Sequence, residues 1–214
     1  MAGVREERRK QIIEAAMDVF GSKGYHRAKM GEIAKVAEIG KSTVYEYFDS
    51  KKDLFEEMIR FIAQYYYDDV QIALHTEEGC KEKLLAFANN HGSFIKSHME
   101  LAENTMTDST SVSEEIKKEM LGWKIKIFKL VENVLKDGIE TGELREGVDT
   151  KSATAIILGA INENYAVQCI IFNQKPEEVQ MEKIIDLIFD GLGRGNSQIS
   201  IHKSQFTNHN EKNF

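Results

Sequence analysis

Two short helical patterns joined by a tight turn constrain the fold of this chain more than any other feature. The first repeats apolar residues at intervals of three and four, namely Met30, Ile33, Ala34 and Ala37. After the turn at 38–40, the pattern over 41–48 places only Val44 and Phe48 inward and leaves hydroxyls, phenols and amines outside. This spacing is typical of a helix-turn-helix, whose second helix sits in the major groove of DNA.

The rest of the chain also favours helices, because apolar residues recur with a period near 3.6 and the only proline is Pro176, which suits the first turn of the last helix. We expect further helices at 5–21, 51–74, 80–98, 111–141, 153–172 and 177–192, with a short polar segment at 99–110. The sequence therefore predicts an all-α protein. It consists of an N-terminal three-helix domain, a larger helical domain and a polar flexible tail, over residues 1–50, 51–195 and 196–214.

Local signals predict where several of these helices begin and end. Ser111-x-x-Glu114 is a capping-box pattern that opens the long helix in the middle of the chain. Asp149 is a cap for the helix that follows it. The stretch from Gly21 to Gly24 ends the first helix, since glycine commonly follows a helix C-terminus.

Charge is divided unevenly along the chain. Lys and Arg total 28 and Asp and Glu total 35, yet residues 1–52 hold 11 basic against 8 acidic side chains. Positive charge is therefore concentrated around the helix-turn-helix pattern, whereas the remainder of the chain is acidic. This division favours contact between the N-terminal part and phosphate groups.

The sequence lacks the features expected of an exported or membrane-inserted protein. Its N-terminus is charged and leads into an amphipathic helix, unlike a signal peptide, and no apolar run approaches the roughly 20 residues that cross a bilayer. Cys80 and Cys169 lack a CxxC pair, which favours buried, reduced thiols, and a redox pair stays open as the alternative. We expect a cytoplasmic protein without membrane contact.

The segment from Gly24 to Leu54 resembles the DNA-binding domain of TetR-type (tetracycline-repressor-like) regulators. The shared features are an aromatic residue after Gly24, Ile33-Ala34-x-x-Ala37, Thr43-Val44-Tyr45-x-Tyr47-Phe48 and Lys51-x-x-Leu54. So many fixed spacings within thirty residues make a specific signal.

The same segment departs from the TetR pattern at four positions, Ala28, Glu38, Gly40 and Ser42, where such proteins usually have Thr, Gly, Ser and often Gly. Ala28 removes a helix cap. Glu38 stands where glycine would ease an unusual backbone angle, a strain of about 1 kcal/mol. We expect these changes to affect the DNA sequence that is read and not the fold.

By this resemblance, the second short helix reads the groove and the surrounding residues hold phosphates. Groove contacts are expected from Lys41, Ser42, Thr43 and Tyr45. Phosphate contacts are expected from Tyr47, Lys51, Lys52, Arg27 and Lys29. Phosphate contacts set register, whereas base contacts set sequence. Two alternatives stay open: Tyr45 as a packing residue, and Glu46 as a solvated or lysine-paired carboxylate instead of an acceptor from cytosine.

The resemblance also implies that the larger domain binds a small effector and forms a homodimer through its last two helices. Candidate effector-binding residues, each of which could instead be plain core, are Phe61, Tyr65, Tyr66, His91, Phe94, Met106, Met120, Trp123, Asn162 and Tyr165. His91 and His98 lie on one inward stripe of the helix expected at 80–98. They could be pocket contacts, core residues or metal ligands, but no carboxylate stands at a ligand spacing beside them. Glu163 could receive a cationic ligand, bind across the dimer or lie at an exposed end. We expect neither a metal nor a cofactor.

We interpret the chain as a ligand-responsive DNA-binding regulator. Repressors are the commoner type among such proteins, and a small hydrophobic effector would release this one from a palindromic operator. The sequence has no Gly-rich phosphate loop, HExxH, GxSxG or paired ExxH pattern, which argues against an enzyme. The alternative is a helical adaptor that acts through protein contacts without binding DNA.

Overall fold

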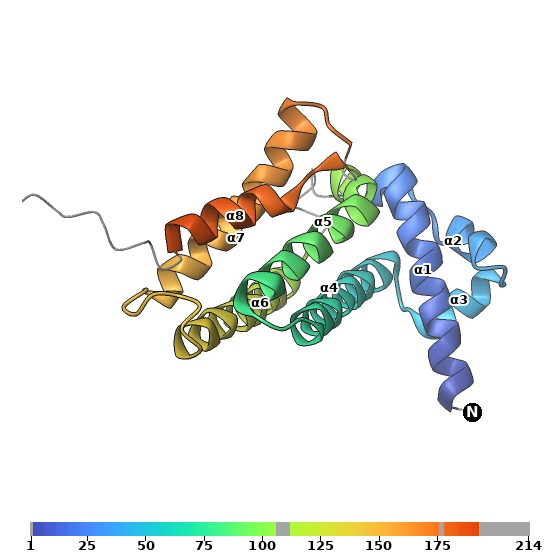
Figure 1. Cartoon of the computed structure of the whole chain (residues 1–214). Helices are drawn as coiled ribbons and strands as arrows, with labels where there is room; N and C mark the ends of the chain where they lie inside the picture. The colour runs from blue at the N-terminus through green and yellow to red at the C-terminus, as the bar shows by residue number, and fades with distance from the viewer. Residues whose placement is uncertain (1, 106–111, 176–177, 193–214) are drawn as a thin grey trace, which may run out of the picture.

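The computed structural model describes residues 2–105, 112–175 and 178–192, and every regular element in these ranges is helical. The elements are α1 (Ala2–Arg27), α2 (Met30–Val36), α3 (Lys41–Tyr47), α4 (Lys51–Thr76), α5 (Cys80–Thr105), α6 (Glu114–Glu140), α7 (Thr150–Ala166), the π-helical turn η2 (Val167–Ile171) and α8 (Met181–Leu192). The predicted all-α architecture, with a small N-terminal domain and a larger helical one, is confirmed (Figure 1). The tail predicted at 196–214 lies outside the described residues.

The N-terminal head, which we define as α1–α3 with the beginning of α4, encloses its own apolar core. The helical spacing of Ile12, Ala16 and Phe20 brings these side chains to the inner face of α1, where each is fully buried. Residues from the other helices complete the core, among them Ile33, Ala34, Val44, Phe48, Leu54, Phe55 and Met58. Two short helices are therefore held by tertiary packing, because helices of seven residues are not stable alone.

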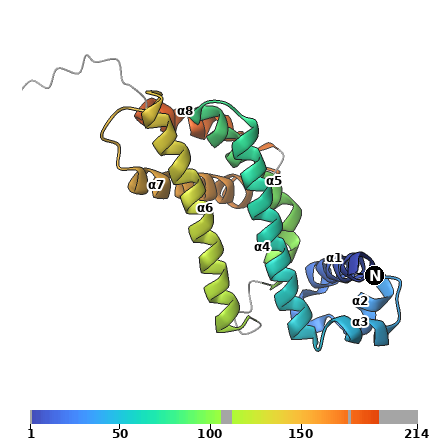
Figure 2. The same ribbon diagram turned by 90° about the horizontal axis from the view of Figure 1, so that it is seen from below.

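The long helix α4 connects the N-terminal head to the larger domain (Figure 2). It starts beside α3 and runs alongside α5 and α6. The C-terminal part of α5 also reaches the head, where Leu101 packs against its core and the backbone of Leu101 lies close to Gly21 of α1. The head is thus attached through α4 and through the packing of α5 against α1.

The larger domain has a second core between α4, α5, α6, α7 and α8. Its buried residues include Leu84, Phe87, Val131, Leu135, Ile157, Ile161 and Ile185. Both α7 and α8 lie on one side of this domain (Figure 1), and Lys81 of α5 forms a salt bridge of 2.7 Å with Asp186 of α8. Among the described residues, no helix is long and apolar enough to span a membrane.

Several helix bounds differ from the sequence-based expectation. The long helix α6 is capped by Ser113, whose hydroxyl accepts from Ile116 N at 3.3 Å, and not by Ser111, which lies outside the described residues. Helix α5 continues to Thr105 and does not end at 98, because Leu101 on its last turns packs against the head.

The last helix also begins later than expected, at Met181 and not at 177. Pro176 and Glu177 lie outside the described residues, and Glu178 precedes the helix. The expected cap at Asp149 is confirmed: its carboxylate accepts from Lys151 N at 3.2 Å and from Ser152 Oγ at 2.6 Å. The expected end of the first helix is a break at Gly24 (φ 75°), after which helical structure continues to Arg27.

Candidate nucleic-acid interface and effector site

Helix α3 is seated on the head by a narrow apolar face. Val44 is fully buried and Phe48, its C-cap, is 1% exposed, as their four-residue spacing predicts. The opposite face carries the predicted groove contacts: Lys41, Ser42 and Tyr45 are exposed, and Thr43 is half-buried. This face therefore offers an ammonium group, two hydroxyls and a phenol to whatever approaches the head.

Tyr45 has 45% of its surface exposed, so it is not a core residue. The ammonium of Lys41 lies 5.8 Å from the centre of its ring, a cation–π distance. Tyr47 is half-buried, and the guanidinium of Arg5 lies 5.7 Å from its ring centre. The carboxylate of Glu46 belongs to an exposed residue, in keeping with its solvated alternative.

The turn between α2 and α3 has the backbone geometry that its sequence departures suggest. Glu38 adopts φ 55°, in the left-handed region where glycine is favoured. The turn is nevertheless closed by backbone hydrogen bonds, from Glu38 N to Lys35 O at 3.2 Å and from Ile39 N to Ala34 O at 3.0 Å. The unusual backbone angle expected at Glu38 is confirmed, and Ile39 packs against the head core.

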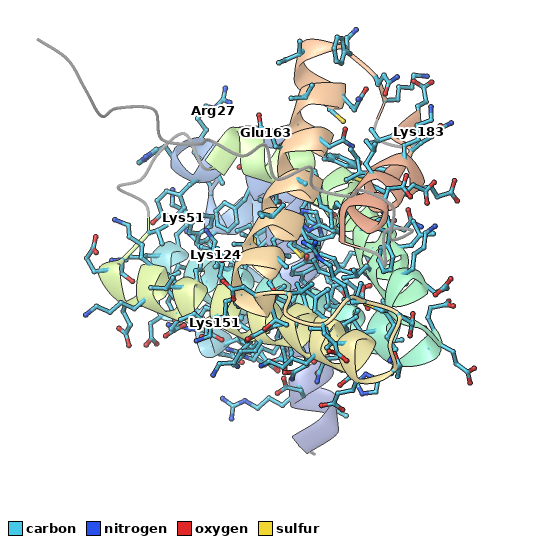
Figure 3. The ribbon with its side chains drawn as sticks, turned by 60° about the vertical axis from the view of Figure 1, so that its left-hand side comes forward. Arg27, Lys51, Lys124, Lys151, Glu163 and Lys183 are labelled. Atoms are coloured by element: carbon cyan, nitrogen blue, oxygen red, sulfur yellow. The ribbon has the colours of Figure 1, made fainter. Side chains whose placement is uncertain are left out.

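The predicted phosphate contacts differ in how free their charges are. Arg27 is exposed and projects from the end of α1 (Figure 3), and Lys29 is exposed just before α2. Lys52 is exposed on the first turn of α4, with its ammonium 3.8 Å from Glu56. Lys51 is different, because its ammonium donates to the carbonyls of Tyr25, His26 and Ala28 at 2.8, 3.2 and 3.1 Å.

In the larger domain, a chain of polar side chains joins three helices. The hydroxyl of Tyr66 on α4 lies 2.6 Å from His91 Nδ1 on α5, and His91 Nε2 lies 2.8 Å from Asn162 Oδ1 on α7. Asn162 Nδ2 donates to Leu158 O at 2.8 Å, so its Oδ1 is the acceptor toward His91. A neutral His91 with its proton on Nε2 satisfies every one of these bonds.

The protonation of His91 follows from these surroundings. Burial lowers the pKa of His91 below its ordinary value, and the hydrogen bond with Asn162 partly offsets this effect. Burial also raises the pKa of the Tyr66 phenol, which keeps its proton available for His91. The chain is therefore a neutral hydrogen-bonded network that is half-buried at Tyr66 and His91 and exposed at Asn162.

Two more predicted effector-binding residues lie beside this network. Phe94 packs on Tyr66 with ring centres 4.3 Å apart, and Tyr165 is buried and donates to Gly92 O at 3.0 Å. His98 stacks on Phe94 at 4.4 Å, and its Nδ1 lies 2.9 Å from Phe94 O, so it belongs to the same aromatic cluster. We call this set of residues the polar centre: Tyr66, His91, Phe94, Asn162 and Tyr165.

The other predicted effector-binding residues do not join the polar centre. Phe61 and Trp123 line an open cleft of about 530 Å³ between α1, α4 and α6. Tyr65 is 53% exposed on α4, Met120 is half-buried on α6, and Met106 lies outside the described residues. Of the nine candidates within the described residues, five therefore form the polar centre, two line the cleft and two lie in neither place.

The cleft between α1, α4 and α6 carries an ionic chain that the sequence reasoning missed. Arg9 pairs with Glu57, Glu57 pairs with Arg60 at 2.6 Å, and Arg60 binds Glu119 through two hydrogen bonds of 2.7 and 3.1 Å. The hydrogen bonds to Glu119 and Glu57 raise the pKa of Arg60. Burial alone would raise the pKa of Glu57, but the hydrogen bonds and charges of Arg9 and Arg60 outweigh burial, so the pKa of Glu57 is lowered. The Glu57–Arg60 spacing is visible in the sequence, whereas the contacts to Arg9 and Glu119 depend on the fold.

The outer faces of α7 and α8 expose large aliphatic side chains. Ile156 is 64% exposed on α7 and Leu187 is 69% exposed on α8. Ile171 and Phe172, at the end of η2, are 70% and 63% exposed. Glu163 is exposed on α7 (Figure 3), so it does not carry the cost of an unpaired buried carboxylate.

A helix-turn-helix head joined to a larger all-helical domain is the architecture of a class of DNA-binding transcription regulators. Residues 12–58 match the family described as "Bacterial regulatory proteins, tetR family", and residues 77–166 match "Tetracyclin repressor-like, C-terminal domain". The chain therefore belongs to the TetR family of transcription regulators, which bind DNA through the head and small ligands through the larger domain.

A curated relative agrees with this assignment, and solved structures share the fold. The chain is 26% identical over 183 residues to the fatty acid metabolism regulator protein of Bacillus subtilis, covering 85% of this chain and 94% of the relative. The crystal structure of FadR from Bacillus subtilis, in complex with stearoyl-CoA, aligns with a TM-score of 0.65 at 23% identity over 87% of this chain and 98% of that one. PfmR from Thermus thermophilus aligns with a TM-score of 0.64 at 23% identity over 86% and 99%.

Proposed function

We propose that this protein is a repressor that a small hydrophobic effector releases from a near-palindromic DNA operator. The observation that carries the proposal is the geometry of α3, which is anchored by Val44 and Phe48 while Lys41, Ser42 and Tyr45 face outward. Thr43 contributes to the same face. Phosphates are held by Tyr47, at the end of α3, and by Lys52, Lys29 and Arg27 elsewhere on the head.

A homodimer presents two copies of α3 to one duplex. Its contact is made by α7 and α8, because Ile156 and Leu187 leave an apolar surface on adjacent helices. Two reading helices about 34–36 Å apart would meet successive major grooves, which requires an operator with two-fold symmetry. Binding to such an operator takes place in the cytoplasm.

The polar centre is our proposed effector site. Tyr66, His91 and Asn162 offer hydrogen-bonding groups among the rings of Phe94 and Tyr165, an arrangement suited to a ligand with one polar end and a long apolar part. A fatty-acid regulator among the relatives and a neighbour bound to stearoyl-CoA support a long-chain acyl-CoA as the effector class. The effector releases DNA only if it binds more tightly to the conformation that fits the operator poorly.

The DNA part of the proposal is tested by a salt titration of duplex binding, with fluorescence anisotropy as the readout. Removing one phosphate contact should reduce the slope of log affinity against log salt by about 0.9. Lys52→Ala is expected to weaken binding and to reduce the slope, whereas Lys124→Ala, an exposed lysine on α6, leaves both unchanged. A protein that acts as an adaptor would show no duplex binding above background.

The effector part is tested on the preformed operator complex. Stearoyl-CoA should dissociate it at concentrations at which coenzyme A alone does not. His91→Leu removes both hydrogen bonds of the imidazole and is expected to raise the concentration needed for release without changing operator affinity. Release by coenzyme A alone, or release of His91→Leu and wild type at the same stearoyl-CoA concentration, would refute the polar centre as the effector site.

A further inference from the structure

Lys51 is the first residue of α4, and its ammonium points back into the head. It donates to three main-chain carbonyls, those of Tyr25, His26 and Ala28, at 2.8, 3.2 and 3.1 Å. An ammonium group has three protons and no acceptor. Its hydrogen-bonding capacity is therefore fully used inside the protein, which leaves no proton directed at a phosphate.

The three carbonyls lie at the end of α1, where helical carbonyls lack amide partners and carry the negative end of the helix dipole. This end is unusual because Gly24, at φ 75°, interrupts the helix just before them. The ammonium also lies 4.5 Å from the centre of the Tyr25 ring. Tyr25 in turn packs on Phe55 of α4, with ring centres 4.8 Å apart. The Tyr25 ring and the Lys51 ammonium therefore both attach the end of α1 to α4.

We propose that Lys51 is a positioning residue, which fixes the end of α1 and the start of α2 to α4, and that it is not a phosphate ligand. The carbonyl of Ala28 directly precedes Lys29, the exposed residue that begins the α2 segment. Lys51 therefore sets the direction in which Lys29 and α2 leave α1, and α2 carries α3. A shift of α4 reaches the reading helix through the same contact. This inference rests on the proposed function.

The neighbouring residue Lys52 provides a matched control. It has the same side chain on the same helix turn, but its ammonium is exposed and its ion pair with Glu56 is long, at 3.8 Å. Removing the charge of Lys52 should therefore change the salt dependence of operator binding. Removing the charge of Lys51 should weaken operator binding without changing its salt dependence. Methionine is the substitution of choice at both positions, because it keeps most of the side-chain length without the charge or the donors.

The test compares Lys51→Met, Lys51→Arg and Lys52→Met in operator titrations at several salt concentrations. Lys51→Met should bind about tenfold more weakly, because its three hydrogen bonds no longer hold the end of α1 in place, while the salt slope stays that of the wild type. Lys51→Arg should recover most of the affinity, since a guanidinium also donates to carbonyls. Lys52→Met should reduce the slope by about 0.9, the effect of one phosphate that is no longer neutralised.

Two outcomes overturn the inference. A reduced slope for Lys51→Met, like that of Lys52→Met, would show that Lys51 holds a phosphate. Wild-type affinity for Lys51→Met, measured well below its melting temperature, would show a role in stability alone. Absence of duplex binding by the wild type would instead refute the proposed function.

A second measurement uses the unmodified chain, in case Lys51→Met does not fold. Acetylation of lysines by an activated acetate ester, followed by mass spectrometry, should be at least about tenfold slower at Lys51 than at Lys52 in the DNA-free protein, because only Lys52 is unshielded. Operator DNA should protect Lys52 further and leave Lys51 unchanged. Equal reactivity of the two lysines in the free protein, with protection of both by DNA, contradicts the inference.

Discussion

His91 Nε2 lies 2.8 Å from Asn162 Oδ1, and this bond joins α5 to α7 through a neutral imidazole. The other ring nitrogen accepts from Tyr66 of α4. If His91 became charged, its Nδ1 would turn from acceptor to donor and the Tyr66 proton would lose its partner. The arrangement therefore disfavours protonation, in agreement with the lowered pKa of His91.

This arrangement predicts a pH-dependent stability. Because the pKa of His91 in the folded state lies below its ordinary 6.5, the unfolded chain binds more protons, and stability falls as pH drops below about 6.5 toward the folded-state value. His91→Gln should flatten this part of the stability curve, measured by urea unfolding between about pH 5 and pH 8. His75→Gln, at an exposed site on α4, is the control for the loss of a histidine. An identical pH dependence in wild type and His91→Gln would refute the prediction.

Glu38 predicts a gain in stability on substitution by glycine. Its φ of 55° costs an L-residue about 1–2 kcal/mol, part of which is returned as the larger backbone entropy of glycine in the unfolded chain. Glu38→Gly should therefore raise the free energy of unfolding by about 0.5–1 kcal/mol. The matched change Lys35→Gly, within α2, should lower it instead. Chemical denaturation of wild type and both variants measures whether each substitution raises or lowers the free energy of unfolding.

Gly92 is expected to tolerate no side chain. A Cβ at this position would lie 2.9 Å from the ring edge of Tyr165, which is buried and hydrogen-bonded to Gly92 O. Gly92→Ala should therefore cost about 1–3 kcal/mol of stability through overpacking. Gly122→Ala on α6, where nothing lies within 4 Å, should stabilise slightly. Thermal unfolding gives both values, and a neutral Gly92→Ala would show that Tyr165 can move.

The pair Arg60–Glu119 should show measurable coupling. Both side chains are about one-third exposed, at 33% and 36%, and solvent screens them, but two parallel hydrogen bonds favour the upper end of the surface range. A double-mutant cycle with alanine should give about 0.5–1 kcal/mol, reduced in about 1 M salt. The exposed pair Glu114–Lys117 on α6 should give almost none. Equal coupling energies in the two pairs would contradict this prediction.

Oligomeric state tests the surface of α7 and α8. Ile156→Asp and Leu187→Asp should each convert a dimer into a monomer, since a charge placed in an apolar contact is costly to bury. Ile72→Asp on α4 is the control, because Ile72 is similarly exposed, at 61%, but lies on a different helix. Sedimentation velocity measures the mass of each protein. Dimers that persist in both α7 and α8 variants would place the contact elsewhere.

Local patterns predicted the parts of the molecule that depend on near neighbours in sequence. The spacing of Val44 and Phe48 predicted the seat of α3, and the departure at Glu38 predicted its backbone angle. The carbonyl contacts of Lys51 were not predictable, because its three partners lie 23 to 26 residues earlier and meet it only after α1 and α4 have packed.

The candidate effector site shows the same limit. Aromatic residues at helical spacing were correctly located on helices, but nothing in their spacing separates Tyr66, in the polar centre, from Tyr65, one residue earlier at the surface. The ionic chain of Arg9, Glu57 and Glu119 joins three helices that are distant in sequence. Such contacts are set by how helices cross, which apolar periodicity alone does not determine.

The central claim, that α3 reads one DNA sequence in two copies, is tested most directly by selecting operators from random duplexes with the purified protein. The account predicts enrichment of a near-palindrome whose half-sites lie about one helical turn apart. Ser42→Ala and Lys41→Ala, on the exposed face of α3, should then relax the preference at defined positions of each half-site. Enrichment of no sequence, or of a site that lacks two-fold symmetry, would contradict the account.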